Sequence, residues 1–251
     1  MMYAGRNKYP LLHDITMQLI VNMDSNNFQI PYDHSYQLYS SLISLIAKQN
    51  EELASKLHGH NSDLRFSISQ IMPGGKRKFT NQGFYGERLV FIISSLDESL
   101  IKIMKQALEQ SGKVEIFNNS FHIHTILTRQ VSPSSEIITV KSRSPIILKM
   151  DNKYYFKDPP EEILGALESN IKNKYMKVKG NLPNIRFIKL QEIKLKEIGL
   201  KGVKVPGLMI SFTIGADLEF LSFILTVGIG SKNKLGFGFV EEEKVGDVNN
   251  R

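Results

Sequence analysis

The order of strands and helices constrains the fold of this chain more than any other feature of its sequence. Alternating apolar positions predict a strand over residues 15–23, and apolar residues three and four apart predict a helix over residues 34–57 with Asp33 as its cap. The other elements of the first half are strands over residues 64–72, 88–95 and 113–128, with a helix between the last two that Gly112 ends. Strand, helix, strand, strand, helix, strand is the order of the ferredoxin-like motif.

The same order begins again after a Ser- and Pro-rich cluster at residues 131–136, which we interpret as a linker between domains. On periodicity alone residues 218–227 fit a strand or a helix, and a repeat of the first half would make them a helix. The other predicted elements are a strand over 137–150 interrupted by Pro145, a helix capped by Asp158 that runs to about Tyr175, strands over 185–198 and 203–214, and a last strand over 237–241. We therefore predict an α+β fold of two tandem ferredoxin-like (βαββαβ, RRM-like) domains, residues 1–130 and 131–251.

Composition excludes several classes of protein. The chain has 251 residues, 41% of them hydrophobic, which is enough to bury the cores of two small domains. It has no run of about 18 apolar residues and no apolar core of a signal peptide, so we expect a soluble, cytoplasmic protein without a membrane partner. The absence of cysteine excludes disulfides, thiolate metal sites and a thiol nucleophile.

The positive charge of the chain is concentrated in one segment. Residues 172–204 carry ten Lys or Arg and two Glu, an excess larger than the net charge of +7 of the whole chain. Such a stripe is typical of a surface that binds nucleic acid, and the alternative is a solvated lysine-rich face. A second cluster, Lys76, Arg77 and Lys78, lies in the sequence PGGKRKF and is predicted to form the mobile basic tip of a loop over residues 73–86.

A glycine-rich run, VGIGSKNKLGFGFV at residues 227–240, follows the last predicted helix. Its four glycines can adopt positive φ or bring bare backbone N–H groups against a ligand, and its two lysines add charge. It is not a P-loop, because Phe237 follows Gly236, and not a dinucleotide fingerprint, because Asn233 stands where a glycine is needed. We interpret the run as a contact for a phosphate backbone, with a turn into the last strand as the alternative.

Histidine is the residue type of this sequence best suited to acid–base chemistry. RNA cleavage without a metal uses the neighbouring 2′-hydroxyl as nucleophile, so a site needs a proton acceptor, a proton donor and cationic groups around the phosphorane. Of the six histidines, His58 stands where the first predicted helix ends, beside Gly59, and His60 is close by. His122 and His124 alternate on a strand, but zinc needs three or four protein ligands, so we predict no metal and no cofactor.

The glycine-rich run resembles the C-terminal glycine-rich loop of the RAMP superfamily, in particular of the CRISPR-associated endoribonucleases that cut repeat RNA into guide RNAs. The family loop is Gly-x-Gly, a short polar basic stretch and Leu-Gly-Phe-Gly, which correspond here to residues 228–230, 231–234 and 235–238. The stretch from PYDHSY at 31–36 to LASKLHGH at 53–60 resembles the first helix of the same enzymes, and His58 falls on the position of their catalytic histidine.

This resemblance implies a metal-independent endoribonuclease that cleaves CRISPR repeat transcripts and leaves a 2′,3′-cyclic phosphate and a 5′-hydroxyl. It also implies His58 as general base or acid. Some members of the family carry a tyrosine where this chain has Ile43, and a lysine where it has Leu64. We therefore predict other residues as helpers of the histidine: Tyr39, His60 and Arg65.

The predicted RNA contacts combine the glycine-rich run with the basic surfaces. They are Gly228, Gly230, Lys232, Lys234, Gly236 and Gly238, together with Lys76, Arg77, Lys78, Lys194, Lys196, Lys201 and Lys204. CRISPR repeat RNA is the expected partner, with other CRISPR effector subunits and a second copy of the chain as further ones. The alternative functions are a non-catalytic RAMP subunit that binds RNA in a CRISPR ribonucleoprotein, and a ferredoxin-like RNA-binding protein without a CRISPR link.

Overall fold

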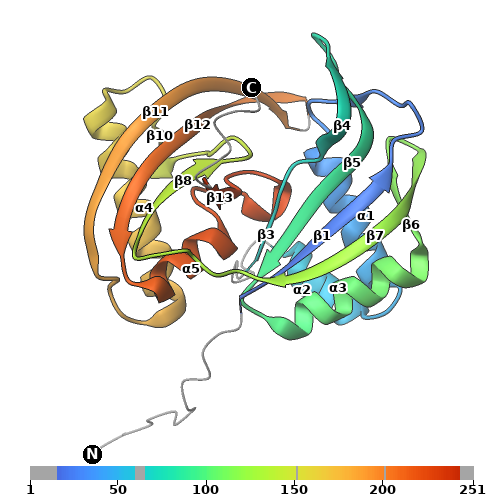
Figure 1. Cartoon of the computed structure of the whole chain (residues 1–251), viewed down its shortest axis with the longest axis horizontal. Helices are drawn as coiled ribbons and strands as arrows, with labels where there is room; N and C mark the ends of the chain where they lie inside the picture. Colours follow the sequence, from blue (N-terminus) through green and yellow to red (C-terminus); the bar gives the residue numbers. More distant parts are fainter. Residues whose placement is uncertain (1–15, 60–65, 151, 201, 244–251) are drawn as a thin grey trace, which may run out of the picture.

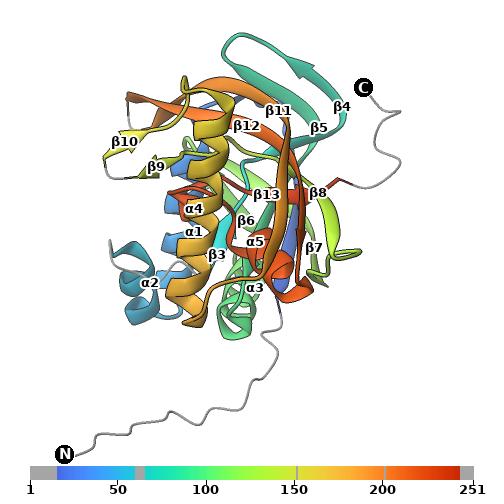
Figure 2. The same cartoon turned by 90° about the vertical axis from the view of Figure 1, so that its left-hand side faces the viewer.

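Two antiparallel sheets form the body of the protein, and helices cover one face of each (Figures 1 and 2). The computed structural model describes residues 16–59, 66–150, 152–200 and 202–243. Within these ranges no helix is both long enough and apolar enough to cross a membrane.

The first sheet has seven strands, and its central strands follow the order of a ferredoxin-like domain. Strand β1 (Met17–Asp24) pairs antiparallel with β5 (Gly83–Ser95) on one side and with β7 (Asn119–Gln130) on the other. The remaining elements of this half are β2 (Ile30–Pro31), α1 (Ser35–Ala47), α2 (Glu51–His58), β3 (Phe66–Ile68), β4 (Met72–Phe79), α3 (Glu98–Ser111) and β6 (Lys113–Ile116). Strands β2, β3 and β4 pair with β5, and β6 pairs with β7.

The second sheet repeats this order with four strands. Strand β12 (Val203–Ala216) pairs with β11 (Ile185–Leu200) and with β8 (Ile137–Ser142), and β8 pairs with β13 (Val240–Glu242). The remaining elements are β9 (Lys149–Met150), β10 (Lys153–Tyr154), α4 (Pro160–Lys179), α5 (Leu218–Val227) and a short 3-10 helix, η1 (Asn233–Leu235). The predicted α+β fold of tandem ferredoxin-like units is confirmed, and residues 218–227 form the helix that the repeat requires.

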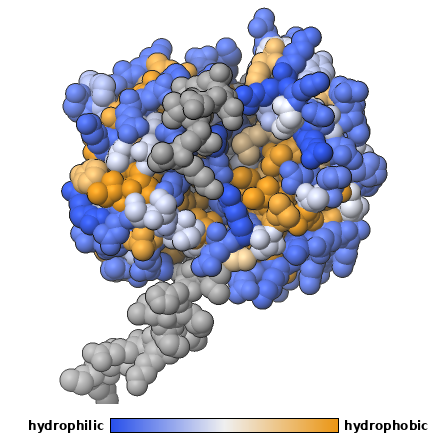
Figure 3. All heavy atoms as spheres, viewed as in Figure 1, coloured by the Kyte–Doolittle hydropathy of each residue, from blue (hydrophilic) through white to orange (hydrophobic). Residues whose placement is uncertain are grey.

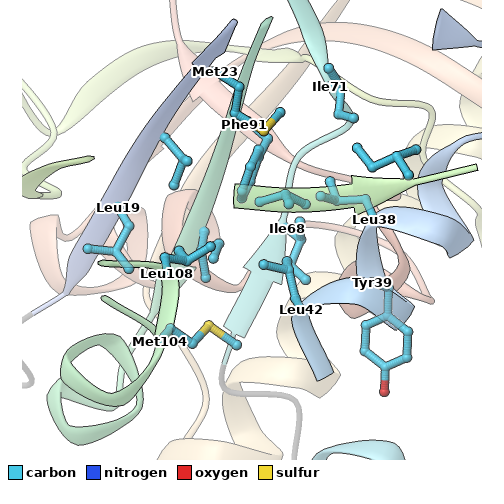
Figure 4. Packing of buried hydrophobic residues seen from close by; sticks show 14 of the residues in the cluster. Leu19, Met23, Leu38, Tyr39, Leu42, Ile68, Ile71, Phe91, Met104 and Leu108 are labelled. Carbon is cyan, nitrogen blue, oxygen red and sulfur yellow. The ribbon is translucent and has the colours of Figure 1, made fainter. Parts of the chain in front are cut away.

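Alternation along β1 determines which face of the first sheet is buried. Leu19, Val21 and Met23 are fully buried, because they point toward the helices, where burial of one such side chain contributes about 2 kcal/mol. Figure 4 shows how side chains from several elements meet in this core: Leu38 and Leu42 from α1, Met104 and Leu108 from α3, Ile68 from β3 and Phe91 from β5.

The opposite face of the first sheet is partly apolar, and helix α5 (Leu218–Val227) of the second half covers it beside β3 and β5. Ile20 of β1 lies between Ile92 of β5 and Leu127 of β7, and Leu127 is 56% exposed. Figure 3 shows apolar side chains gathered over these strands. Helix α2 lies on the other side of the molecule, away from β7 and β8 (Figure 2). His58, at the end of α2, is therefore not on the apolar face of the first sheet.

The helix predicted over residues 34–57 is two helices, α1 and α2, which is a correction. The chain leaves α1 after Ala47, and Asn50 starts α2 because its side chain accepts a hydrogen bond from the Leu53 N–H at 2.9 Å. The cap position of α1 is His34 and not Asp33. The His34 ring donates through Nδ1 to the Pro31 oxygen and accepts from the Ile71 N–H, and burial lowers its pKa to about 4, so it is a neutral structural group.

Three other predicted segments also differ. The loop expected over residues 73–86 is a hairpin of β4 and β5, on which Lys76, Arg77 and Lys78 are exposed strand residues. The strand expected over 113–128 is a second hairpin, because Phe117 and Asn118 adopt positive φ between β6 and β7. The strand expected over 137–150 ends at Ser142, before Pro145.

Helix α4 begins differently from the prediction. Asp158 is not its cap, because Pro159 occupies that position and Pro160 is the first helical residue. The Asp158 carboxylate instead lies 2.8 Å from the Lys153 ammonium and accepts from the Phe156 N–H. The helix also runs beyond Tyr175 to Lys179, where Gly180 ends it with a left-handed backbone.

A third apolar cluster joins the two halves. It contains Ile147, Ile198, Leu200, Val205 and Phe237 from the second half, with Tyr36 of α1 packed against it. A buried hydrogen bond, from the Ser67 hydroxyl to the Thr226 carbonyl at 2.6 Å, crosses the same boundary. The glycine-rich run is therefore fixed against the first half.

Candidate active site

His58 is the last residue of α2, and its ring stacks on the ring of Tyr39 from α1. The two rings lie nearly parallel, with centroids 6.4 Å apart and 13° between their planes. His58 is exposed, whereas only 3% of Tyr39 is exposed. The Tyr39 hydroxyl donates to the Leu57 carbonyl at 3.0 Å, which ties α1 to the last turn of α2. Figure 4 shows Tyr39 at the margin of the first core, with its hydroxyl directed away from the packed side chains.

The surroundings of Tyr39 keep its hydroxyl protonated and hydrogen-bonded within the protein. Burial, and secondarily the neighbouring Tyr36, raises the pKa of the Tyr39 hydroxyl, so this group keeps its proton at neutral pH. That proton is already donated to the Leu57 carbonyl. In this geometry the tyrosine ring lies parallel to the histidine ring, and its hydroxyl is engaged within the protein.

Lys234 reaches this site from the glycine-rich run of the second half. Its ammonium donates to the carbonyl oxygens on both sides of His58, that of Leu57 at 2.8 Å and that of Gly59 at 3.0 Å. It also lies 5.9 Å from the centroid of the Tyr39 ring. The last carbonyls of a helix have no partner within the helix and carry partial negative charge, which makes the end of α2 a favourable place for a cation. Desolvation lowers the pKa of Lys234.

The four glycines of the run adopt positive φ, as predicted: 71° at Gly228, 74° at Gly230, 82° at Gly236 and 63° at Gly238. The space around them explains why they are glycine, since a Cβ at Gly238 would lie 1.8 Å from the Ile229 oxygen. Their amides are used inside the protein; the Gly230 N–H donates to the Asn170 side chain and the Gly238 N–H to the Pro145 carbonyl. A direct role of these glycines in RNA binding stays a prediction.

The basic stripe predicted over residues 172–204 is more strongly paired than the sequence suggests. Lys194 and Lys204 pair with Glu192 and Glu197 of the same hairpin, while Lys196 is exposed beside them. Glutamates from outside the stripe take three more of its cations, in the pairs Lys172–Glu168, Lys179–Glu219 and Arg186–Glu136. The stripe is still cationic, but glutamates from outside it make its electrostatic potential less positive than the charges of residues 172–204 alone predict.

Several predicted site residues lie away from His58 or outside the description. Lys76, Arg77 and Lys78 lie on the β4–β5 hairpin, at the other end of the first half from α2 (Figure 1). Lys232 is the cap residue before η1 and has a left-handed backbone. His60, Arg65 and Lys201 lie outside the described residues. In the part of the chain that the structure describes, no group of three His, Asp or Glu side chains is arranged to hold a metal ion.

Sequence reasoning assigned Lys234 to the RNA backbone and missed its contacts with the carbonyl oxygens on both sides of His58. The two residues belong to different halves, and the hydrogen bond from Lys234 to Leu57 spans 177 positions of the chain. The available signal was the resemblance itself, since the glycine-rich run and the first helix both match one family. Only the packing of the two halves brings those stretches together.

The chain matches two descriptions of one protein family along most of its length. Residues 29–127 match "CRISPR-associated protein Cas6, N-terminal" and residues 128–242 match "CRISPR associated protein Cas6, C-terminal". The fold thus defines a protein built from two tandem ferredoxin-like units. The chain belongs to the Cas6 family.

Individual relatives agree with this assignment. The chain is 24% identical to the CRISPR-associated endoribonuclease Cas6 of Pyrococcus furiosus, with 90% of this chain and 89% of the relative aligned. It is also 24% identical to the CRISPR-associated endoribonuclease Cas6 1 of Methanocaldococcus jannaschii, with 90% and 92% aligned. A solved structure described as an RAMP protein binding different RNA substrates has the same fold, with a TM-score of 0.77, 23% identity, and 91% and 100% covered. The predicted enzyme class, an endoribonuclease, is confirmed by this membership.

Proposed function

We propose that this protein uses His58 to cleave CRISPR repeat RNA by a metal-independent transesterification. The 2′-oxygen attacks the adjacent phosphorus, the bond from phosphorus to the 5′-oxygen breaks, and the products carry a 2′,3′-cyclic phosphate and a 5′-hydroxyl. One observation supports the proposal above others: Lys234 of the second half donates to the carbonyl oxygens on both sides of His58 in the first half.

Each residue of the site has a distinct proposed role. The exposed imidazole of His58 accepts the 2′-proton or protonates the 5′-oxygen, and the second proton is exchanged with solvent. The Lys234 ammonium stabilises the extra negative charge of the phosphorane. This interaction accelerates the reaction because it is stronger in the transition state than with the bound substrate. Tyr39 supports the imidazole through the stacked ring. His60 and Arg65 stay as predicted helpers.

RNA binding is proposed to use cations both near the site and away from it. Lys232 is next to η1, Lys76, Arg77 and Lys78 lie on the β4–β5 hairpin, and Lys194, Lys196 and Lys204 lie on the β11–β12 hairpin. Lys201, outside the described residues, stays a predicted contact. Contacts of this kind fix the phosphate backbone and make affinity depend on salt, whereas base identity is read elsewhere. Association with other CRISPR effector subunits, dimerisation and a cytoplasmic location stay predictions.

The proposal is tested with end-labelled repeat RNA in the presence of EDTA. We expect one cut that survives chelation, disappears when the nucleotide before the cut carries a 2′-deoxy group, and leaves a 5′-hydroxyl. His58→Ala is expected to bind the same RNA and to lose the cut, with His124→Ala, an exposed histidine on β7, as the matched control. A requirement for a divalent cation would contradict the mechanism. RNA binding without any cut would instead favour the alternative of a non-catalytic RAMP subunit.

A further inference from the structure

Lys174 is a lysine of the predicted basic stripe whose ammonium does not face solvent. It lies on α4, where its backbone and stem are half-buried, and its Nζ points under the glycine-rich run. Nζ donates to the Gly228 carbonyl at 3.0 Å and to the side-chain oxygen of Asn233. One turn earlier, the Asn170 side chain accepts from the Gly230 N–H at 2.8 Å. Two polar side chains of α4 thus hold the glycine-rich run through hydrogen bonds.

The position of this ammonium is costly. Both of its acceptors are neutral oxygens, so hydrogen bonds rather than an ion pair compensate for the loss of water. Desolvation lowers the pKa of Lys174 to about 7. Filling the space with an apolar side chain would avoid this cost, so the ammonium requires an explanation beyond packing.

The contacts of Asn233 connect Lys174 to the active site. Asn233 is fully buried, and its Nδ2 donates to the Ile229 carbonyl at 2.9 Å and to the Phe237 carbonyl at 3.0 Å. It therefore bridges the two glycine-containing ends of the run. The next residue is Lys234, whose ammonium reaches the Leu57 and Gly59 carbonyls beside His58. Rotation of Asn233 would move the backbone from which Lys234 extends.

We propose that Lys174 is a positioning residue for RNA cleavage. It fixes Asn233 and Gly228, and through them it keeps the Lys234 ammonium beside His58, without itself touching RNA. This inference rests on the proposed function of His58 and Lys234. It assigns to α4 of the second half a role in the chemistry at the end of α2 in the first half.

Lys174→Met tests the inference because it keeps the length of the stem and removes the ammonium. We expect the single-turnover rate at saturating repeat RNA to fall about 10- to 100-fold, the scale of loss caused by misplacing a catalytic group by about 1 Å. Affinity for the same RNA with a 2′-deoxy group at the cut should change little. Lys102→Met, on α3 and paired with Glu98 at the surface, is the matched control and should cleave as wild type.

A double-mutant cycle separates positioning from a general loss of structure. Lys174→Met should cause no further loss in a Lys234→Ala background, because both changes remove the same cation from the site. Lys174→Gln, which retains a donor, should lose less activity than Lys174→Met and provides the test if the methionine variant does not fold.

Two results overturn the inference. One is cleavage by Lys174→Met at the wild-type rate. The other is that Lys174→Met lowers the rate, the RNA affinity and the melting temperature, and that these losses add to those of Lys234→Ala. Failure of the proposed function itself is recognised separately, by cleavage in His58→Ala at the wild-type rate.

Discussion

The β4–β5 hairpin and the glycine-rich run look alike in the sequence and differ in the structure. Both combine glycines with closely spaced basic residues. The hairpin projects from its sheet (Figure 1), and Lys76, Arg77 and Lys78 are exposed on it. The run packs against α4 and α1, its four glycines are buried, and Lys234 reaches the other half. Composition therefore identifies a cationic segment, and packing decides whether that segment is a surface or part of a site.

The largest expected effect concerns the glycines of the two segments. Gly238→Ala would place a Cβ 1.8 Å from the Ile229 carbonyl oxygen at a φ of 63°, so we expect a loss of stability of about 3 kcal/mol or more. Gly75→Ala on the hairpin also has positive φ, but its Cβ would meet the movable end of the Glu87 side chain, so we expect about 1 kcal/mol. Urea unfolding of both variants measures the difference. Equal losses would contradict the contrast between a packed run and an open hairpin.

The next largest effect concerns the lysines. Lys234→Ala should lower the single-turnover cleavage rate at saturating RNA about 100-fold, the scale of one lost group that stabilises the transition state. Lys78→Ala, the matched change on the hairpin, should leave that rate unchanged. If Lys234→Ala weakens only the affinity for RNA, Lys234 is a backbone contact like the hairpin lysines, and the contrast between the two segments disappears.

A smaller effect is expected when the hairpin loses its charge. Replacing Lys76, Arg77 and Lys78 together by Ala should reduce the slope of log affinity against log salt by up to about 3, because each lysine or arginine that contacts a phosphate contributes about 1. The rate at saturation should not change. Binding is measured at several salt concentrations with 2′-deoxy repeat RNA, and an unchanged slope would remove the hairpin from the RNA-binding surface.

The smallest effect is a pH dependence confined to the packed run. Above about pH 7 folded Lys174 is neutral while the unfolded chain still binds its proton, so this lysine makes the free energy of unfolding rise with pH. Wild type should therefore gain about 1 kcal/mol relative to Lys174→Met between pH 7 and pH 8. Lys78→Ala should follow wild type at both pH values. A constant difference between wild type and Lys174→Met would indicate an ordinary pKa for Lys174.

The sequence was most informative where a pattern is local. Periodicity predicted most strands and helices, and the resemblance of the run and of the first helix identified the family. The catalytic role that it implies for His58 stays a prediction. The break between α1 and α2 was missed because apolar spacing continues across it, although Asn50 is a typical N-cap. The hairpin of β4 and β5 was missed because PGGKRKF favours a turn, and pairing with β5 decides its structure.

Contacts between segments far apart in the sequence could not be predicted from local patterns. Lys174 and Lys234 were counted as surface charge because lysine is usually exposed. Their burial depends on carbonyls and amides that distant segments supply, such as Leu57 for Lys234 and Gly228 for Lys174. The partners of the basic stripe were underestimated for the same reason, since Glu136 and Glu219 are far from it in sequence or on another element.

The contact between Lys234 and the end of α2 also has a consequence for biosynthesis. A nascent polypeptide that has left the ribosome only as far as the first sheet carries the imidazole without the ammonium. The second half must fold before Lys234 can reach the backbone carbonyls on either side of His58. On the proposed role of Lys234, unfinished chains would be inert toward the RNA around them, and cleavage would begin only when the last strands are in place.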